Sequence, residues 1–145
     1  MAYKTYICAV LFAFTTGCNN NKDSDSKFIS IEEFEQKVVD SVGEKAINCG
    51  KVDIGDSIFV VNTCVSDSFF INTPFYAIYI RQGTDSSVAS ALAMNSSGVV
   101  EHWSYDSDIS GGSNRESRVI STVCENPNIA LYLNDINIDI IECTN

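Results

Sequence analysis

A short polar stretch that begins at Asp106 holds the residues whose types and spacing come closest to a chemical site. Asp106, Asp108 and Ser110 place oxygen atoms at alternate positions, and the glycine pair Gly111 and Gly112 follows at once. Calcium prefers such hard oxygen ligands, and loops that bind it use a glycine at the sixth position for a sharp turn. The spacing therefore predicts a candidate calcium site with Asp106, Asp108 and Ser110 as ligands.

The second half of this stretch departs from the calcium pattern. Counted from Asp106, the twelfth position of an EF-hand carries a bidentate glutamate, but here it is Ser117, and Glu116 falls one residue early. Turn chemistry explains the same residues without a metal, because aspartate, serine and asparagine bond to nearby backbone and glycine permits positive φ. We therefore interpret the stretch as a structural or recognition loop between two strands, with an irregular calcium loop as the alternative. Its recognition residues are Asp106, Asp108, Gly111, Gly112 and Asn114.

Histidine-assisted nucleophilic catalysis would have to use His102, the only histidine of the chain. It lies in a predicted strand, without the G-x-S-x-G elbow of serine hydrolases. Nineteen acidic residues leave carboxylate chemistry formally open, but no spacing singles out a pair. We therefore predict a protein that is not an enzyme and has no cofactor, apart from the candidate calcium ion.

The leader, residues 1–17, has the parts of a secretory signal peptide: one lysine, an apolar block that ends at Phe14, and small residues before Cys18. The cysteine directly after them makes the segment resemble a bacterial lipoprotein signal. The resemblance implies that Cys18 is acylated and becomes the mature N-terminus, although Thr15 stands where an aliphatic residue is usual. An ordinary secretion signal with a chance cysteine, or a buried N-terminal strand, is the alternative.

Residues 18–27 are predicted to be the lipidated cysteine and a flexible tether. The run NNNKDSDSK contains no apolar side chain, so it cannot bury enough surface to offset the entropy of ordering. The resemblance implies a lipid anchor in the cell envelope, with the body facing the periplasm. Asn19 stands where enterobacterial lipoproteins of the inner membrane have aspartate, which implies the outer membrane.

The chain is strongly acidic. Its formal net charge is -10, and removal of Lys4 with the leader leaves 8 basic and 19 acidic side chains, or -11. A field of this sign disfavours nucleic acid and anionic lipid and favours cations or basic proteins. We therefore expect no nucleic-acid partner, a membrane contact only through the lipid, and a basic protein as the partner class that the charge permits.

Four cysteines remain once the leader is removed and Cys18 is acylated: Cys49, Cys64, Cys124 and Cys143. An even number in an exported chain favours disulfides, and without a C-x-x-C motif a redox pair or zinc site is disfavoured. Three pairings are open. Closeness in sequence favours Cys49 with Cys64 and Cys124 with Cys143.

Residues 28–145 are predicted to form one domain, because the length leaves room for a single core. Ser30 and Glu33 have the spacing of a capping box, which predicts a helix from about Ile31 to Lys45.

A second apolar segment follows Asp56 and Ser57. Helical spacing there favours a helix, whereas its many β-branched residues leave a strand as the alternative. The expected helical face is Ile58, Val61, Cys64, Val65 and Phe69.

From Phe75 the sequence becomes typical of strands. FYAIYIRQ, SVASALAM and VVEHWSYD predict a three-stranded meander, and SRVISTVC, IALYL and INIDIIEC supply up to three more strands. We therefore predict an α+β fold, with one or two N-terminal helices packed on one face of an antiparallel sheet of about five or six strands.

The aromatic residues either fill this core or line a ligand groove, and the β-rich sequence favours the core. They are Phe69, Phe70, Phe75, Tyr76, Tyr79, Trp103 and Tyr105. The predicted function is that of a small acidic cell-envelope lipoprotein, a non-catalytic binding or accessory module. Alternatives are a periplasmic inhibitor or immunity protein against a basic hydrolase or toxin, and a calcium-binding surface domain.

Overall fold

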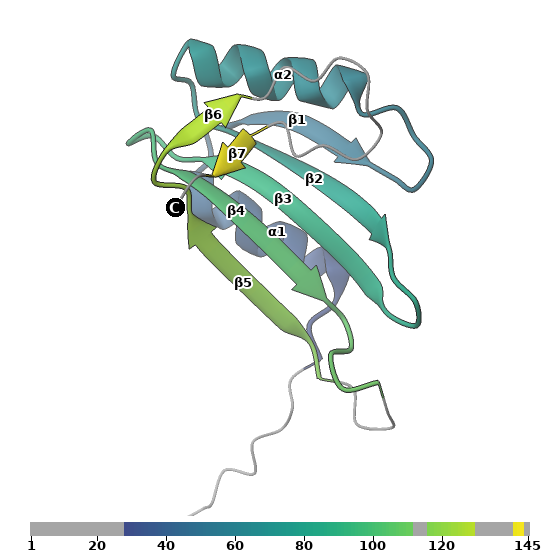
Figure 1. Ribbon diagram of the computed structural model, residues 1–145. Coiled ribbons are helices and arrows are strands. Elements are labelled where there is room, and N and C mark those ends of the chain that lie inside the picture. The colour runs from purple at the N-terminus through teal and green to yellow at the C-terminus, as the bar shows by residue number, and fades with distance from the viewer. Residues whose placement is uncertain (1–27, 112–115, 130–140, 144–145) are drawn as a thin grey trace, which may run out of the picture.

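The computed structural model describes residues 28–111, 116–129 and 141–143. Leader and tether, with Cys18, lie outside these ranges, and neither helix within them is long and apolar enough to span a membrane. The described elements, in chain order, are α1 (Ile31–Val42), β1 (Ile47–Val52), α2 (Phe59–Phe70), β2 (Phe75–Gln82), β3 (Ser87–Met94), β4 (Val100–Asp106), β5 (Arg118–Val123), β6 (Pro127–Ile129) and β7 (Ile141–Cys143) (Figure 1).

A five-stranded sheet in the order β1-β2-β3-β4-β5 forms the centre of the domain. β2, β3 and β4 form the predicted meander, and β5 continues it in the antiparallel sense. β1 pairs with β2 in parallel, so the α+β class is confirmed and the wholly antiparallel sheet is corrected to a mixed one. The cause is α2, which returns the chain to the end of the sheet where β1 began. β6 and β7 form a separate antiparallel pair.

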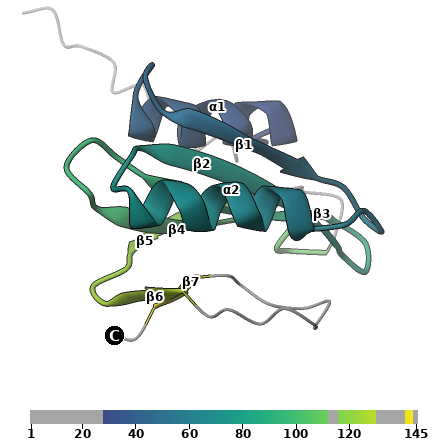
Figure 2. The ribbon, with the colours of Figure 1, turned by 90° about the horizontal axis from the view of Figure 1, so that it is seen from above.

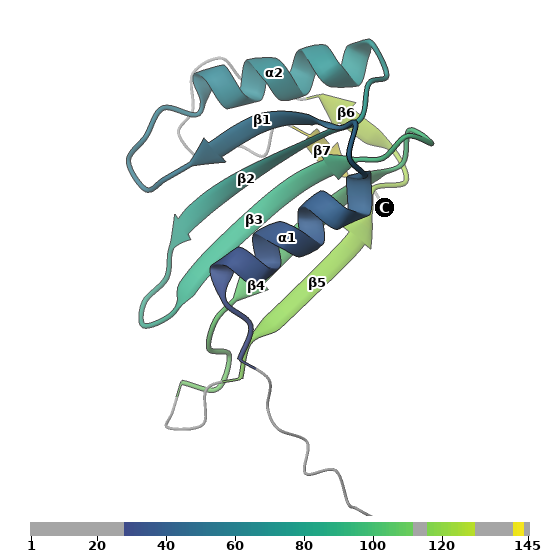
Figure 3. The ribbon, with the colours of Figure 1, turned by 180° about the vertical axis from the view of Figure 1, so that it is seen from behind.

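The two helices contribute to different hydrophobic clusters. Side chains alternate along a strand, so Ala89, Ala91 and Ala93 of β3 pack in the cluster of α1, whereas Leu92 and Met94 pack in that of α2. Figures 1 and 3 show α1 over one face of the sheet, and Figure 2 shows α2 with β6 and β7 on the other side. The structure therefore does not show the expected packing of the helices on one face.

Helix α1 begins as the sequence predicts. The Ser30 hydroxyl accepts a hydrogen bond from the Glu33 backbone N–H at 3.2 Å, and the Glu33 carboxylate accepts one from the Ser30 N–H at 3.0 Å. The helix ends at Val42, before the predicted Lys45, because Gly43 follows with a φ of +85°. Its apolar face packs on the alanines of β3, whose small side chains let the helix lie close to the sheet.

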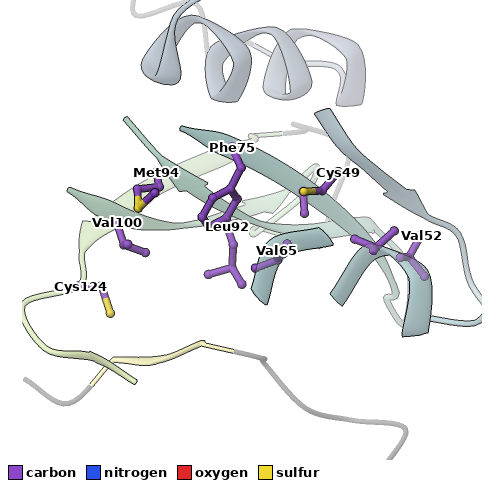
Figure 4. Packing of buried hydrophobic residues seen from close by; sticks show 10 residues of the cluster. Cys49, Val52, Val65, Phe75, Leu92, Met94, Val100 and Cys124 are labelled. Atoms are coloured by element: carbon purple, nitrogen blue, oxygen red, sulfur yellow. The ribbon is translucent and has the colours of Figure 1, made fainter. Parts of the chain in front are cut away.

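The predicted helix of the second apolar segment is confirmed, although local sequence supports this helix poorly. Its N-cap, Ile58, makes no side-chain hydrogen bond, and residues such as Val60, Val61 and Thr63 have modest helix propensity. Contacts with the sheet therefore hold α2. Val61 and Val65 are buried in the cluster shown in Figure 4, against side chains that include Phe75.

Side-chain links join α2 to the sheet. The predicted disulfide between Cys49 of β1 and Cys64 of α2 is confirmed, with a Cα–Cα distance of 5.4 Å. The Tyr79 hydroxyl of β2 donates a hydrogen bond to Asn62 Oδ1 at 2.9 Å. Together they fix the rotation of the helix over β1 and β2.

The second predicted disulfide is settled only in part. Cys124 is disulfide-bonded, and β6–β7 pairing places the backbone of Cys143 opposite Pro127. The side chain of Cys143 lies outside the described residues. The pairing of Cys124 with Cys143 therefore stays a prediction.

Removal of the first disulfide should destabilise the domain measurably. Cys49 and Cys64 are 15 residues apart in sequence. Closing a loop of that length stabilises a fold by about 3 kcal/mol in the chain-entropy model. We expect Cys49→Ala/Cys64→Ala to lose about that much free energy of unfolding in urea titrations. Each single substitution breaks the same bond and serves as the comparison; an unchanged denaturation midpoint in the double variant would contradict the prediction.

Candidate functional site

The predicted recognition loop lies between β4 and β5, at one end of the sheet (Figure 1). Pairing with β3 continues past the end of β4, since Ser107 N–H donates to the Ser87 carbonyl at 2.9 Å and Ser87 N–H donates to the Ser107 hydroxyl at 2.8 Å. The two sides of the loop are joined where Ile109 N–H donates to the Glu116 carbonyl at 3.0 Å. The base of the loop is thus closed by hydrogen bonds.

The two aspartates of the candidate calcium site bind the backbone of their own loop. Asp106 Oδ1 accepts from Asp108 N–H at 3.0 Å. Asp108 Oδ1 accepts from Ser110 N–H at 3.1 Å and from the Ser110 hydroxyl and Gly111 N–H at 3.0 Å each. Gly111 has a φ of +62°, a conformation that favours glycine. These contacts match the turn-forming interpretation of the sequence.

The candidate calcium ligands are not part of a cluster of acidic side chains among the described residues. In the part of the chain that the structure describes, no three histidine, cysteine, aspartate or glutamate side chains are grouped so that they could hold a metal ion. Gly112 and Asn114, the other recognition residues, lie outside the described residues.

The beginning of the domain is fixed beside this loop. Ile29 N–H donates to the Ser117 hydroxyl at 3.0 Å, and the Tyr105 hydroxyl donates to the Ile29 carbonyl at 2.8 Å. Ser117 Oγ also lies 3.2 Å from the Ser107 carbonyl oxygen. The Tyr105 ring stacks on Phe34 with centroids 5.3 Å apart. Ile29 is therefore held at the corner formed by β4, β5 and the loop.

Two hollows flank the loop. The smaller one, which we call the acidic hollow, has a volume of about 380 Å³ and lies between the loop and the β2–β3 turn. Its lining residues are Gln82, Gly83, Thr84, Asp85, Ser86, Ser87, Ser107 and Asp108. The two chain segments lie close, since a Cβ added at Gly111 would be 3.8 Å from Asp85 Oδ2. The hollow thus brings carboxylates from two segments to one end of the sheet.

The larger hollow, of about 620 Å³, lies between α1 and β5 and is lined by Trp103 among other residues. Of the seven aromatic residues considered for a ligand groove, Trp103 alone lines it. Phe75 and Tyr105 are buried, as the core interpretation expects, whereas Phe70 is exposed. The aromatic residues therefore do not form a common groove.

His102 lies on β4, opposite Leu92 of β3 and Thr122 of β5. Its Nε2 is buried and has no hydrogen-bond partner among the described residues. No described nucleophile or carboxylate is therefore bonded to this nitrogen.

Sequence reasoning missed Asp85, although the meander contained a signal for it. Alternate connections of an antiparallel meander lie at the same end of a sheet. The β2–β3 turn must therefore lie near the β4–β5 loop, which brings Asp85 toward Asp108.

Comparison with models of protein families, with curated proteins and with solved structures finds no match for this chain.

Calcium should not stabilise the domain, because the described residues bring no third acidic side chain to Asp106 and Asp108 to complete a metal site. We expect residues 19–145 to melt at the same temperature in about 1 mM calcium, a concentration that suits weak extracellular sites, and in chelator. Magnesium at the same concentration controls for ionic strength. A calcium-specific rise in melting temperature would instead support the irregular calcium loop.

The Tyr105 hydroxyl should make the free energy of unfolding of the domain fall as the pH becomes alkaline. Burial raises its pKa above the ordinary value, and the negative charge of Glu32 acts in the same direction. The folded protein keeps the proton longer than the unfolded chain, so this stabilisation is complete below about pH 10 and is lost as pH rises further.

The comparison that tests this dependence is wild type against Tyr105→Phe. At neutral pH the variant lacks the hydrogen bond to Ile29 and should be less stable. In urea titrations the difference in free energy of unfolding should shrink as pH rises past about 10. A difference that stays constant across that range would contradict the prediction; the tyrosines shared by both proteins cancel.

Proposed function

We propose that this chain is a small acidic cell-envelope lipoprotein that acts as a non-catalytic binding or accessory module. In this proposal its lipid is attached at Cys18 and its body faces the periplasm, at the outer membrane. The contacts of Ile29 support a tether that joins the domain beside the β4–β5 loop. The acidic hollow lies at the same end of the sheet.

The observation that carries the proposal is the acidic hollow itself. Asp85 and Asp108 line it together with hydroxyl and backbone groups, and none of its lining residues is a lysine or arginine. The net charge of -10 adds a long-range field of the same sign. A lysine or arginine side chain of a partner would therefore find charge-assisted acceptors there. This chemistry favours a basic protein as the ligand.

A periplasmic inhibitor or immunity protein against a basic hydrolase or toxin is the specific form of binding that this charge favours. Acidic side chains steer the encounter with a cationic partner and raise its association rate, an effect that salt screens. Crosslinked capture of the tagged protein from its own envelope, followed by identification of the partner, tests the binding role. Failure to capture any partner would count against it.

The acidic hollow should determine how fast a basic partner binds. We expect Asp85→Asn/Asp108→Asn to slow association with the captured partner by about tenfold at low salt and to weaken the salt dependence. Asparagine keeps the side-chain oxygen that Ser110 and Gly111 donate to, so the loop should keep its shape.

The matched control is Glu44→Gln/Glu125→Gln, which removes the same charge from two exposed positions that do not line the hollow. Association rates are measured by surface plasmon resonance across a salt series. Equal slowing in both double variants would show that net charge alone, rather than the hollow, guides the encounter.

A further inference from the structure

The outer side of α2 carries an unusual set of exposed apolar side chains. Phe59, Val60, Phe70 and Ile71 are 64%, 72%, 68% and 69% exposed. Helical spacing places Phe59, Val60 and Phe70 on one side of a helix about 18 Å long, at its two ends, with Thr63 and Asp67 between them and Ile71 directly after it as the C-cap. Exposed apolar patches of this kind mark interaction surfaces. We call Phe59, Val60, Thr63, Phe70 and Ile71 the α2 stripe.

The stripe lies on a helix that the rest of the domain holds in place. The disulfide to Cys49 and the hydrogen bond from Tyr79 fix the opposite side of α2 to the sheet. Phe69, packed against the core, makes an edge contact with Phe70, with ring centroids 6.3 Å apart. A preformed surface loses little conformational entropy on binding, which favours affinity.

The chain segment that carries the stripe is acidic, and the nearby Lys51 of β1 interacts electrostatically with Asp53. Asp53 and Asp56 precede α2 and are exposed, and Asp67 lies on α2 between the two ends of the stripe. Residues 53–74 contain these three acids and no lysine or arginine. We call Asp53, Asp56 and Asp67 the acidic rim. The α2 stripe and its acidic rim are complementary to a partner surface that has apolar side chains flanked by positive charges.

We infer that the α2 stripe is a docking surface for an amphipathic helix of another protein, whose apolar side chains pack on the stripe and whose flanking lysines or arginines meet the acidic rim. A helix fits because the stripe is straight and has helical spacing, so the two can pack along their lengths. This surface is separate from the acidic hollow, and the inference stands whether or not the hollow binds a cation.

Two other occupants fit the surface less well. A second copy would offer no cation to Asp67, since α2 carries no basic residue. A membrane surface is usually anionic, and helices that lie on it carry lysine or arginine beside their apolar face. The proposed tether also joins the domain at Ile29, beside β5, whereas α2 packs on β1 and β2 about 19 Å across the sheet.

A synthetic peptide provides the test. The probe is a dye-labelled helical peptide with leucines at i, i+4 and i+7 and lysines on both flanks, titrated with residues 19–145 and followed by fluorescence anisotropy. We expect Val60→Glu to weaken binding at least about tenfold, because it removes the most exposed apolar anchor of the stripe and puts a charge in its place. The matched control is Ile120→Glu on β5, the same replacement at an exposed aliphatic residue that pairs with Ser104, which should alter the affinity less than about twofold.

The charge requirement is tested separately. Replacing the peptide lysines with glutamates, or Asp67 with lysine, should each weaken binding about tenfold. Val60 and Ile120 are both exposed, so both glutamate variants should keep the wild-type melting temperature, which shows that they are folded. No binding of the lysine peptide, or equal weakening by the two glutamate variants, would overturn the inference.

Further measurements separate the other occupants and the proposed function. Sedimentation that shows dimers lost in Val60→Glu would assign the stripe to a second copy, and flotation with anionic vesicles lost in the same variant would assign it to a membrane; either result overturns the inference. A captured partner that binds more slowly to Asp85→Asn/Asp108→Asn, yet binds Val60→Glu as it binds the wild type, would support the proposed function. That result would overturn the inference about the α2 stripe.

Discussion

The crossover from β1 through α2 to β2 is the constraint on which the rest of the structure depends. β1 and β2 run in parallel, so the chain must travel the length of the sheet between them, and α2 is the element that does so. This passage puts α2 over one face, while α1 and the alanines of β3 occupy the other. The later strands then add in a meander, whose alternate turns converge at one end. The acidic hollow is a product of that convergence.

The two faces of β3 explain how one short strand supports both layers. Ala89, Ala91 and Ala93 leave room for α1 to approach closely, whereas Leu92 and Met94 fill the space beneath α2. Each face therefore has its own packing depth. An alanine replaced by a large residue would push α1 away from the sheet, whereas the same volume is required on the opposite face.

The parts of the fold that depend on local signals could be predicted from the sequence. Two such signals are the capping box at Ser30 and Glu33 and the turn residues of the meander. Each acts between residues a few positions apart, so the neighbouring sequence is enough to predict its effect. The parallel pairing of β1 could not be predicted, because it depends on where a long crossover returns. The candidate site likewise has one part that local sequence predicts and one part that depends on the fold. Local turn chemistry predicted the hydrogen bonds of Asp108, but Asp85 joins it only through strand pairing.

The Cys49–Cys64 disulfide also has a consequence for timing. Such bonds do not persist in the reducing cytosol and form in oxidising compartments. Before oxidation, α2 lacks one of its links to the sheet, and its own sequence has little helical preference to replace it. If the chain is exported as proposed, the helix that carries its exposed phenylalanines and valine gains this covalent support only after secretion. The α2 stripe would then reach its final rigidity in the envelope, where the proposed partner would bind it, and not in the cytosol during synthesis.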